Sequence, residues 1–231
     1  MLKLYDLAGA EPDRRFSPYC WRIRMALAHK GLEVETIPWR FTEKNVVAPS
    51  GASGRVPVLV DGDRWIAESW DIANYLEATY PDRPTLFGGA AGQALTRFYQ
   101  GWTDGVLQLA LLRLVVLDIW RHCDPKDRDY FRTSREERLH MTLEEAVAGR
   151  EARLPELQRI LAGVRLTVQA QPFLGGSGPL YADYVVFGAF QWARCISDFK
   201  LLAPDDPVAA WRGRMLELYG GLAAKAKGYP V

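Results

Sequence analysis

The 231-residue sequence has few cysteines, no long apolar run and no excess of either charge. Its three cysteines (Cys20, Cys123 and Cys195) are an odd number and lie far apart, which favours a reducing compartment and argues against a disulfide framework. The longest apolar stretch, residues 106–117, is interrupted by polar side chains and is too short to span a bilayer. These absences exclude a membrane-spanning protein and a small disulfide-stapled domain.

The charges are nearly balanced: Lys and Arg number 29, Asp and Glu number 28, and no basic run stands out. We therefore expect no nucleic-acid partner. The first residues lack the basic and apolar regions of an export signal, so we expect a cytoplasmic protein. The histidines (His29, His122 and His140) show no metal-ligand spacing, so we expect no metal. What is present is an ordinary globular composition, 48% hydrophobic and 25% charged, with eight tryptophans.

The first eighty or so residues change hydrophobic period several times, which is typical of a mixed α/β unit. Ser17 and Pro18 suit the N-cap and first position of a helix that Gly31 ends. Asp61-Gly62-Asp63 between two short apolar runs predicts a hairpin, and Ser69 is expected to cap the next helix. The predicted order is strand, helix, strand, irregular segment, hairpin and helix, over residues 2–7, 18–30, 33–37, 38–55, 56–67 and 69–80.

A stretch rich in proline and glycine follows, over residues 81–89. Beyond it the alternating strand patterns vanish and helical periodicity takes over. The predicted helices span residues 91–120, 135–149, 154–169, 181–200 and 207–222. The sequence therefore predicts two domains, a mixed α/β domain over residues 1–82 and an all-α domain over 91–231, joined by a linker over 83–90.

The segment Phe16-Ser17-Pro18-Tyr19-Cys20 places a hydroxyl at a helix start and a thiol one turn later. The unsatisfied N–H groups at such a terminus favour an anion. Thiol-redox proteins use a C-P-Y-C motif here to activate their first cysteine; Ser17 replaces that cysteine, and a hydroxyl is suited to donate to a thiolate supplied by another molecule. The alternatives are that Ser17 is only an N-cap and Cys20 only a small packed side chain.

Two further pairs of residues lie where a predicted strand or helix of the same domain begins. Val56-Pro57 opens a strand, and a cis bond there would turn the Val56 main chain toward an extended peptide; a plain edge proline is the alternative. Glu68-Ser69 opens a helix, where N–H groups and a hydroxyl suit a carboxylate and Glu68 suits an ammonium. A capping pair without a ligand is the alternative there. Together the two pairs and Ser17 predict a site for a thiol that ends in an α-amino acid.

These motifs resemble the glutathione transferase family over essentially the whole chain. The resemblance is carried by S-P-Y-C-W-R-I-R-M-A-L (17–27), G-R-V-P-V-L (54–59) and A-E-S-W-D-I-A-N-Y-L (67–76). It implies a thioredoxin-like N-terminal domain joined to an all-α C-terminal domain, with glutathione as cosubstrate and a cis bond before Pro57.

The resemblance also implies roles for single residues. Ser17 faces the glutathione sulfur as the catalytic residue, the Val56 main chain pairs with the cysteinyl unit, and Glu68 and Ser69 hold the γ-glutamyl end. In the family a Ser or Thr usually stands three residues before the Asp that opens the core helix, but here Leu180 precedes Asp183. The start of that helix must therefore be held by Asp183 or by water.

Finer features are similar to bacterial lignin β-etherases and their fungal relatives. They are a long first loop (8–16) and the segments 127–136, 142–145 and 148–155. This narrower likeness suggests a glutathione-dependent transferase that acts on an aromatic electrophile, with β-aryl ethers among the candidates. The competing hypotheses are a protein that binds glutathione or aromatic ligands without turnover, a thiol oxidoreductase that uses Cys20, and a regulatory scaffold.

The second substrate should lie between the first helix and the all-α domain. Aromatic walls favour flat apolar ligands, although core packing is the commoner use of each ring. The candidate wall residues are Phe16, Tyr19, Trp39, Trp102, Leu112, Trp120, Tyr184, Phe187 and Trp192. Arg22 and Arg24 are expected on a solvated helix face. A homodimer is expected from the resemblance, with the apolar face of 91–117 as part of an interface.

Overall fold

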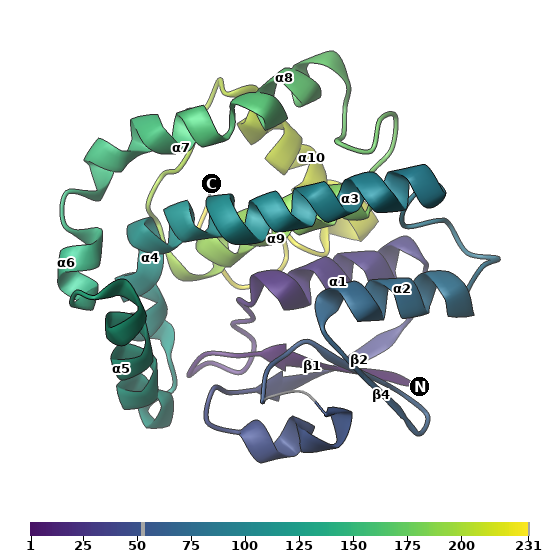
Figure 1. The fold of residues 1–231 in the computed structure, drawn as a ribbon, viewed down its shortest axis with the longest axis horizontal. Helices are drawn as coiled ribbons and strands as arrows, with labels where there is room; N and C mark the ends of the chain where they lie inside the picture. Colours follow the sequence, from purple (N-terminus) through teal and green to yellow (C-terminus); the bar gives the residue numbers. More distant parts are fainter. Residues whose placement is uncertain (52–53, 231) are drawn as a thin grey trace.

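The chain folds into a small mixed α/β domain that lies against a larger helical domain (Figure 1). The computed structural model describes residues 1–51 and 54–230, so Val231, the last residue of the predicted helical domain, lies outside the described residues. The architecture is the predicted one, a thioredoxin-like sheet with helices followed by an all-α unit. Within the described ranges, no helix is both long and apolar enough to cross a membrane.

The N-terminal domain is built on a four-stranded sheet of order β2-β1-β3-β4. β1 pairs in parallel with β2 and antiparallel with β3, and β3 pairs antiparallel with β4. Leu4 and Leu59, partners across β1 and β3, are completely buried. The strands are β1 (Leu2–Leu7), β2 (Val34–Trp39), β3 (Val58–Asp61) and β4 (Arg64–Ala67).

The predicted hairpin is confirmed: Asp61 pairs with Arg64 across a two-residue turn, and Gly62 supplies the positive φ, 58°, that the turn requires. The peptide bond between Val56 and Pro57 is cis, as the family resemblance implies. The irregular segment before it contains the 3-10 helix η1 (Lys44–Ser50).

The helices α1 (Pro18–His29) and α2 (Ser69–Thr79) lie between the sheet and the helical domain (Figure 1). Ser17 is the N-cap of α1, as predicted, and its Oγ accepts a hydrogen bond from the Cys20 N–H at 3.2 Å. The predicted cap of α2 is wrong: Glu68, with φ 66° and ψ 128°, takes the N-cap position, and Ser69 is the first helical residue.

The described residues of the C-terminal domain form helices joined by loops (Figure 1). The predicted helix over 135–149 is two helices, because His140 adopts φ 55° and a capping box between Thr142 and Glu145 starts the next one. The elements are α3 (Ala90–Trp102), the π-helix η2 (Thr103–Leu107), α4 (Gln108–His122), η3 (Pro125–Asp127), α5 (Arg128–Leu139), α6 (Leu143–Val147), η4 (Arg150–Arg153), α7 (Leu154–Ile160), α8 (Ala162–Ala170), α9 (Tyr181–Ile196) and α10 (Pro207–Gly221).

The central helix α9 is held at its start by the buried carboxylate of Asp183. This carboxylate accepts hydrogen bonds from the main-chain N–H groups of Leu174, Gly175 and Leu180, at 2.7–3.0 Å. The indole N–H of Trp211 donates a fourth, at 2.9 Å. Asp183 therefore replaces the side-chain cap that Leu180 lacks, which is one of the two alternatives predicted from the sequence.

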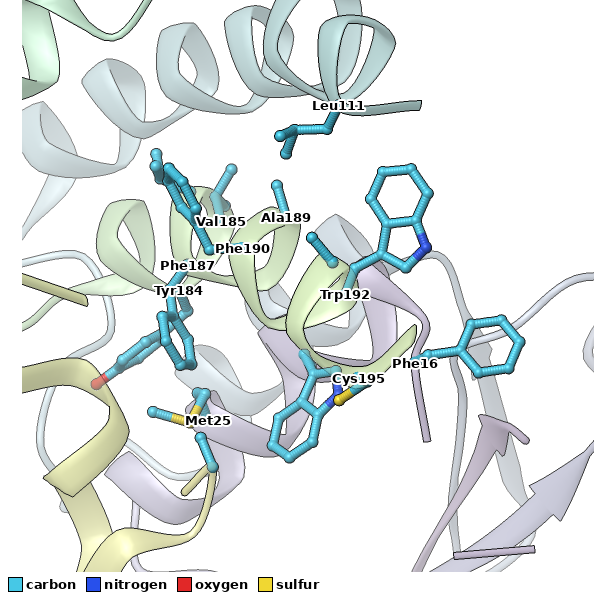
Figure 2. Close-up of a cluster of buried hydrophobic side chains, with 14 of the residues drawn as sticks. Phe16, Met25, Leu111, Tyr184, Val185, Phe187, Ala189, Phe190, Trp192 and Cys195 are labelled. Carbon is cyan, nitrogen blue, oxygen red and sulfur yellow. The ribbon is translucent and has the colours of Figure 1, made fainter. Parts of the chain in front are cut away.

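The two domains meet where α1 packs against α9, through the apolar cluster that Figure 2 shows in part. Arg22 of α1 lies in this contact and is completely buried, so the expectation of a solvated face is wrong for it. Its guanidinium reaches across the interface to Asp104 of η2, with Nη2 at 2.5 Å from Oδ1. Arg24 is mostly covered as well, because it lies over the Trp21 ring and 3.5 Å from the Asp6 carboxylate.

Candidate functional site

A cavity of about 550 Å³ lies between the two domains, at the start of α1. This volume is in the range of small-molecule binding sites. Its walls come from both domains: the N-terminal domain supplies Ser17, Val56, Glu68 and Ser69, and the helical domain supplies residues of α3, η2, α4, α5 and α9. The structure thus brings all four residues proposed for the thiol site to one cavity.

Ser17 lies where β1 has ended and α1 begins, and its side chain lines the cavity although only 3% of the residue is exposed. Its hydroxyl oxygen accepts the Cys20 N–H, and the hydroxyl also hydrogen-bonds to the Cys20 thiol; because the hydroxyl proton can rotate, it can be donated instead to a ligand in the cavity. Pro18 follows as the first helical residue, where its lack of an N–H costs no hydrogen bond. The helix terminus adds partial positive charge, so this point of the cavity favours an anion that accepts a hydrogen bond.

Cys20, one turn further along α1, is completely buried. Burial raises the pKa of its thiol well above the usual value, and the Asp6 carboxylate acts in the same direction. Its Sγ lies 3.9 Å from the main-chain oxygen of Tyr5. A neutral thiol without access to solvent is a poor nucleophile, so the environment of Cys20 favours the packing hypothesis.

Glu68 and Ser69 stand at the junction of β4 and α2. Glu68 has a positive φ, which a residue with a β-carbon adopts at some cost in energy. Among the described residues its carboxylate has no hydrogen-bond partner. Ser69 is buried, and its main-chain oxygen accepts the Tyr181 hydroxyl at 2.8 Å, which ties this junction to α9. The junction therefore presents an uncompensated carboxylate beside a helix start.

The predicted aromatic walls divide into two groups. Phe16, Tyr19, Trp39 and Trp192 line the cavity, as does Leu112. The others lie elsewhere: Trp102 is on α3 outside the lining, and Trp120 packs under the guanidinium groups of two arginines of α5.

Tyr184 and Phe187 are buried in the domain contact and do not line the cavity. The Tyr184 hydroxyl lies 2.6 Å from His29 Nδ1. Figure 2 shows Tyr184 beside Met25, at the opposite end of the cluster from Phe16 and Trp192. The helical period of α9 thus turns Tyr184 away from the cavity, although Trp192 on the same helix reaches it.

Several wall residues were missed by the sequence analysis. Phe41 follows β2, and α5 contributes two aromatic residues and two arginines: Tyr130, Phe131, Arg135 and Arg138. The signal for α5 was present, because aromatic and basic residues recur there at helical spacing, three to five positions apart. Phe41 carried no such signal, since it lies in the irregular segment.

A polar strip on the helical side of the cavity comes from α3, η2 and α4. It consists of Gln100, Asp104 and Gln108. The Gln108 side-chain amide donates to Asp104 Oδ1 at 2.9 Å, and Arg22 neutralises the same carboxylate from behind. Asp104 belongs to a π-helical turn, a local departure that is common at functional sites.

Tyr19 lies beside this strip, with its ring under the Arg22 guanidinium at 4.6 Å. Burial and the nearby Asp104 carboxylate raise the pKa of its phenol. Tyr19 therefore remains a neutral hydroxyl at physiological pH, next to Ser17.

Family models cover most of the chain. Residues 12–84 match the model described as the glutathione S-transferase N-terminal domain, and residues 94–213 match that of the glutathione S-transferase C-terminal domain. A curated relative, a probable glutathione S-transferase of Oryza sativa subsp. japonica, is 25% identical over 216 residues, which is 86% of this chain and 80% of the relative.

Solved structures agree in fold. A glutathione transferase from Phanerochaete chrysosporium superposes with a TM-score of 0.76 at 27% identity, covering 97% of this chain and 93% of the other. A glutathione S-transferase from Ceriporiopsis subvermispora, solved in complex with glutathione, also has a TM-score of 0.76; at 24% identity, over 97% of this chain and 94% of the other, it supports the fold. With both domain models matched in order, this chain belongs to the glutathione S-transferase family.

Proposed function

We propose that the protein joins glutathione to an apolar aromatic electrophile, with Ser17 as the residue that stabilises the glutathione thiolate. The observation that carries this proposal is the place of the Ser17 hydroxyl: it lines the cavity at the N-cap of α1, and its oxygen accepts the Cys20 N–H. A thiolate in the cavity would accept the hydroxyl proton of Ser17.

The energies are large enough for this role. A free thiol has a pKa of about 8.5, and lowering it by about two units requires roughly 2.7 kcal/mol of preference for the anion. A hydrogen bond to a charged acceptor contributes about 1.5–3 kcal/mol. The terminus of α1 adds up to about 1 kcal/mol.

The rest of glutathione fits the remaining residues of the N-terminal domain. The Val56 main chain, next to the cis bond, suits antiparallel pairing with the cysteinyl unit. The uncompensated Glu68 carboxylate suits the ammonium of the γ-glutamyl end, and the start of α2 at Ser69 suits its carboxylate.

The aromatic part of the cavity receives the electrophile. The thiolate sulfur attacks the electrophilic carbon, a C–S bond forms, and the bond to the leaving group breaks with its electron pair on that group. With an aryl halide the halide leaves; with a β-aryl ether the phenoxide leaves and takes a proton from water. The likeness of the segments 127–136, 142–145 and 148–155 to β-etherases, and the α5 rings in the wall, support an aryl ether as a substrate.

Two assembly features belong to the same proposal. The α3 side chains of Leu95 and Phe98 are 67% and 70% exposed, an apolar surface suited to a homodimer. All three cysteines are free and buried, which fits a cytoplasmic location.

The test offers the protein glutathione with 1-chloro-2,4-dinitrobenzene and with a β-aryl ether that releases a fluorescent phenol. We expect mass spectrometry to detect thioether products from both electrophiles. With the β-aryl ether, the amount of phenol released should be proportional to the amount of thioether formed. If glutathione binds but none of the electrophiles yields a thioether above the uncatalysed rate, the protein is a binding protein and the proposal fails.

A further inference from the structure

Two arginines of α5 face the cavity without a counter-ion. Arg135 and Arg138 are three residues apart, so they lie on one face of the helix, and both line the cavity. Among residues 1–51 and 54–230, neither forms an ion pair. By contrast, Arg132, one turn earlier, is paired with Glu136 at 2.8 Å and with Glu144 at 2.9 Å. Arg132 thus engages Glu136 and Glu144, and the cavity side of α5 keeps the positive charge of Arg135 and Arg138.

The acidic residues of the cavity do not compensate this charge. Asp104 is held by Arg22 at 2.5 Å. Glu68 stands at the glutathione end, where Arg55 is also part of the lining. The α5 end of the cavity is therefore left with Arg135 and Arg138 and no opposing carboxylate among the described residues.

The guanidinium of Arg135 is held in place by two aromatic rings and a hydroxyl group. Its guanidinium lies over the Phe131 ring at 4.6 Å and near the Phe41 ring at 5.3 Å, and Nη1 donates to the Ser134 hydroxyl at 2.8 Å. Burial and the like charge of Arg138 lower the pKa of Arg135. The attraction of a bound anion would offset both effects. A planar guanidinium held on aromatic rings is suited to bind a carboxylate through two hydrogen bonds.

We propose that the electrophile of this enzyme is an aromatic carboxylate, whose ring lies against Phe41 and Phe131 and whose carboxylate is bound by Arg135, with Arg138 adding to the local positive charge. This inference rests on the proposed function, because it names the substrate class of the same cavity. The glycyl end of glutathione is the other source of a carboxylate in this site, and the experiment separates the two.

The experiment uses matched electrophiles, 4-chloro-3,5-dinitrobenzoate and the neutral 4-chloro-3,5-dinitrobenzamide, at saturating glutathione. We expect Arg135→Gln to lower kcat/KM for the acid about tenfold or more, as for a lost charge-assisted hydrogen bond, mainly through KM. The rate with the amide should change less than about twofold. Arg135→Lys should retain part of the preference, since it keeps the charge and loses the planar fork. Arg159→Gln removes an exposed charge from α7 and should leave both rates unchanged.

Binding measurements make the outcome independent of turnover. Calorimetry with S-methylglutathione present should show 2-naphthoate binding more tightly than 2-naphthamide, and Arg135→Gln should abolish the difference. Equal binding of the two ligands by the wild-type protein overturns the inference. So does a loss of glutathione affinity in Arg135→Gln with the acid preference intact, which assigns Arg135 to the glycyl carboxylate. Amide turnover without acid preference refutes this inference alone, whereas no turnover of either electrophile refutes the proposed function.

Discussion

Gly188 of α9 lies so close to Pro18 of α1 that a β-carbon on Gly188 would stand 2.5 Å from the Pro18 carbonyl oxygen. Backbone atoms on both sides make this contact, so a rotamer change cannot relieve it. Because Pro18 directly follows Ser17, the central helix of the second domain supports the helix start at which we expect the thiolate. A change in the contact between the two domains is therefore expected to move the proposed thiolate site.

This contact predicts the effect of Gly188→Ala. The added methyl group should force α1 and α9 apart and lower the free energy of unfolding by about 1–3 kcal/mol, the usual cost of overpacking. Glutathione affinity should fall with it, because Ser17 moves. Denaturant unfolding and calorimetry measure both. Gly213→Ala in α10, where a β-carbon meets nothing within 4 Å, is the control; it should stabilise the protein by about 0.5–1 kcal/mol. Equal stability of the two variants would contradict the close contact.

Cys20 should be inert. Because its thiol is buried and its pKa is raised, Cys20→Ser should leave conjugation rates within about twofold of the wild type. None of the three cysteines, all buried, should react rapidly with an aromatic disulfide reagent until the protein is unfolded. Rapid reaction of Cys20 in the native protein, or loss of disulfide exchange in Cys20→Ser, would instead support the oxidoreductase hypothesis.

The histidines predict how stability depends on pH. Burial lowers the pKa of His29, whose ring lies against Tyr184, and burial and Arg14 lower the pKa of His122. The unfolded chain then binds protons more readily than the folded one, so the free energy of unfolding falls as the pH drops through about 6.5, the ordinary histidine value.

Urea unfolding between pH 7.5 and pH 5.5 tests this dependence. His29→Gln removes one titrating group and keeps a partner for the Tyr184 hydroxyl, so the decline should be smaller in the variant. A decline of the same size in both proteins would show that His29 does not contribute.

The exposed face of α3 predicts the assembly state. If Leu95 and Phe98 form part of a dimer contact, Phe98→Asp should yield a monomer in analytical ultracentrifugation. Leu166→Asp on α8 is the matched control, since Leu166 is 68% exposed and lies on another helix. A wild-type monomer, or dissociation by Leu166→Asp as well, would remove α3 as the interface.

Local signals predicted the parts of the fold that depend on neighbouring residues. The Ser17-Pro18 helix start and the Gly62 turn follow from the residues at those positions. The helical periodicity of residues 135–149 does not predict the break between α5 and α6, although Thr142 and Glu145 have capping-box spacing.

Long-range contacts explain what local patterns could not predict. The charge of Arg22 indicated a solvated face, but its partner, Asp104, lies 82 residues away in another domain. Trp120 and Tyr184 are of the residue type that lines binding sites, but they point away from the cavity. Tertiary packing sets the rotation of a helix relative to a cavity, and the sequence does not show it. The position of Arg135 in the cavity wall depends in the same way on how α5 is rotated by tertiary packing.

The most direct measurement follows the ultraviolet absorbance of the glutathione thiolate in complex with the protein as the pH is varied. The thiol of bound glutathione should titrate about two units below the value of about 8.5 for a free thiol. Ser17→Ala should raise the pKa of the bound thiol by about one unit or more, toward the value of the free thiol, whereas Ser17→Thr should keep it low. A bound thiol that titrates as it does in free solution would contradict the account.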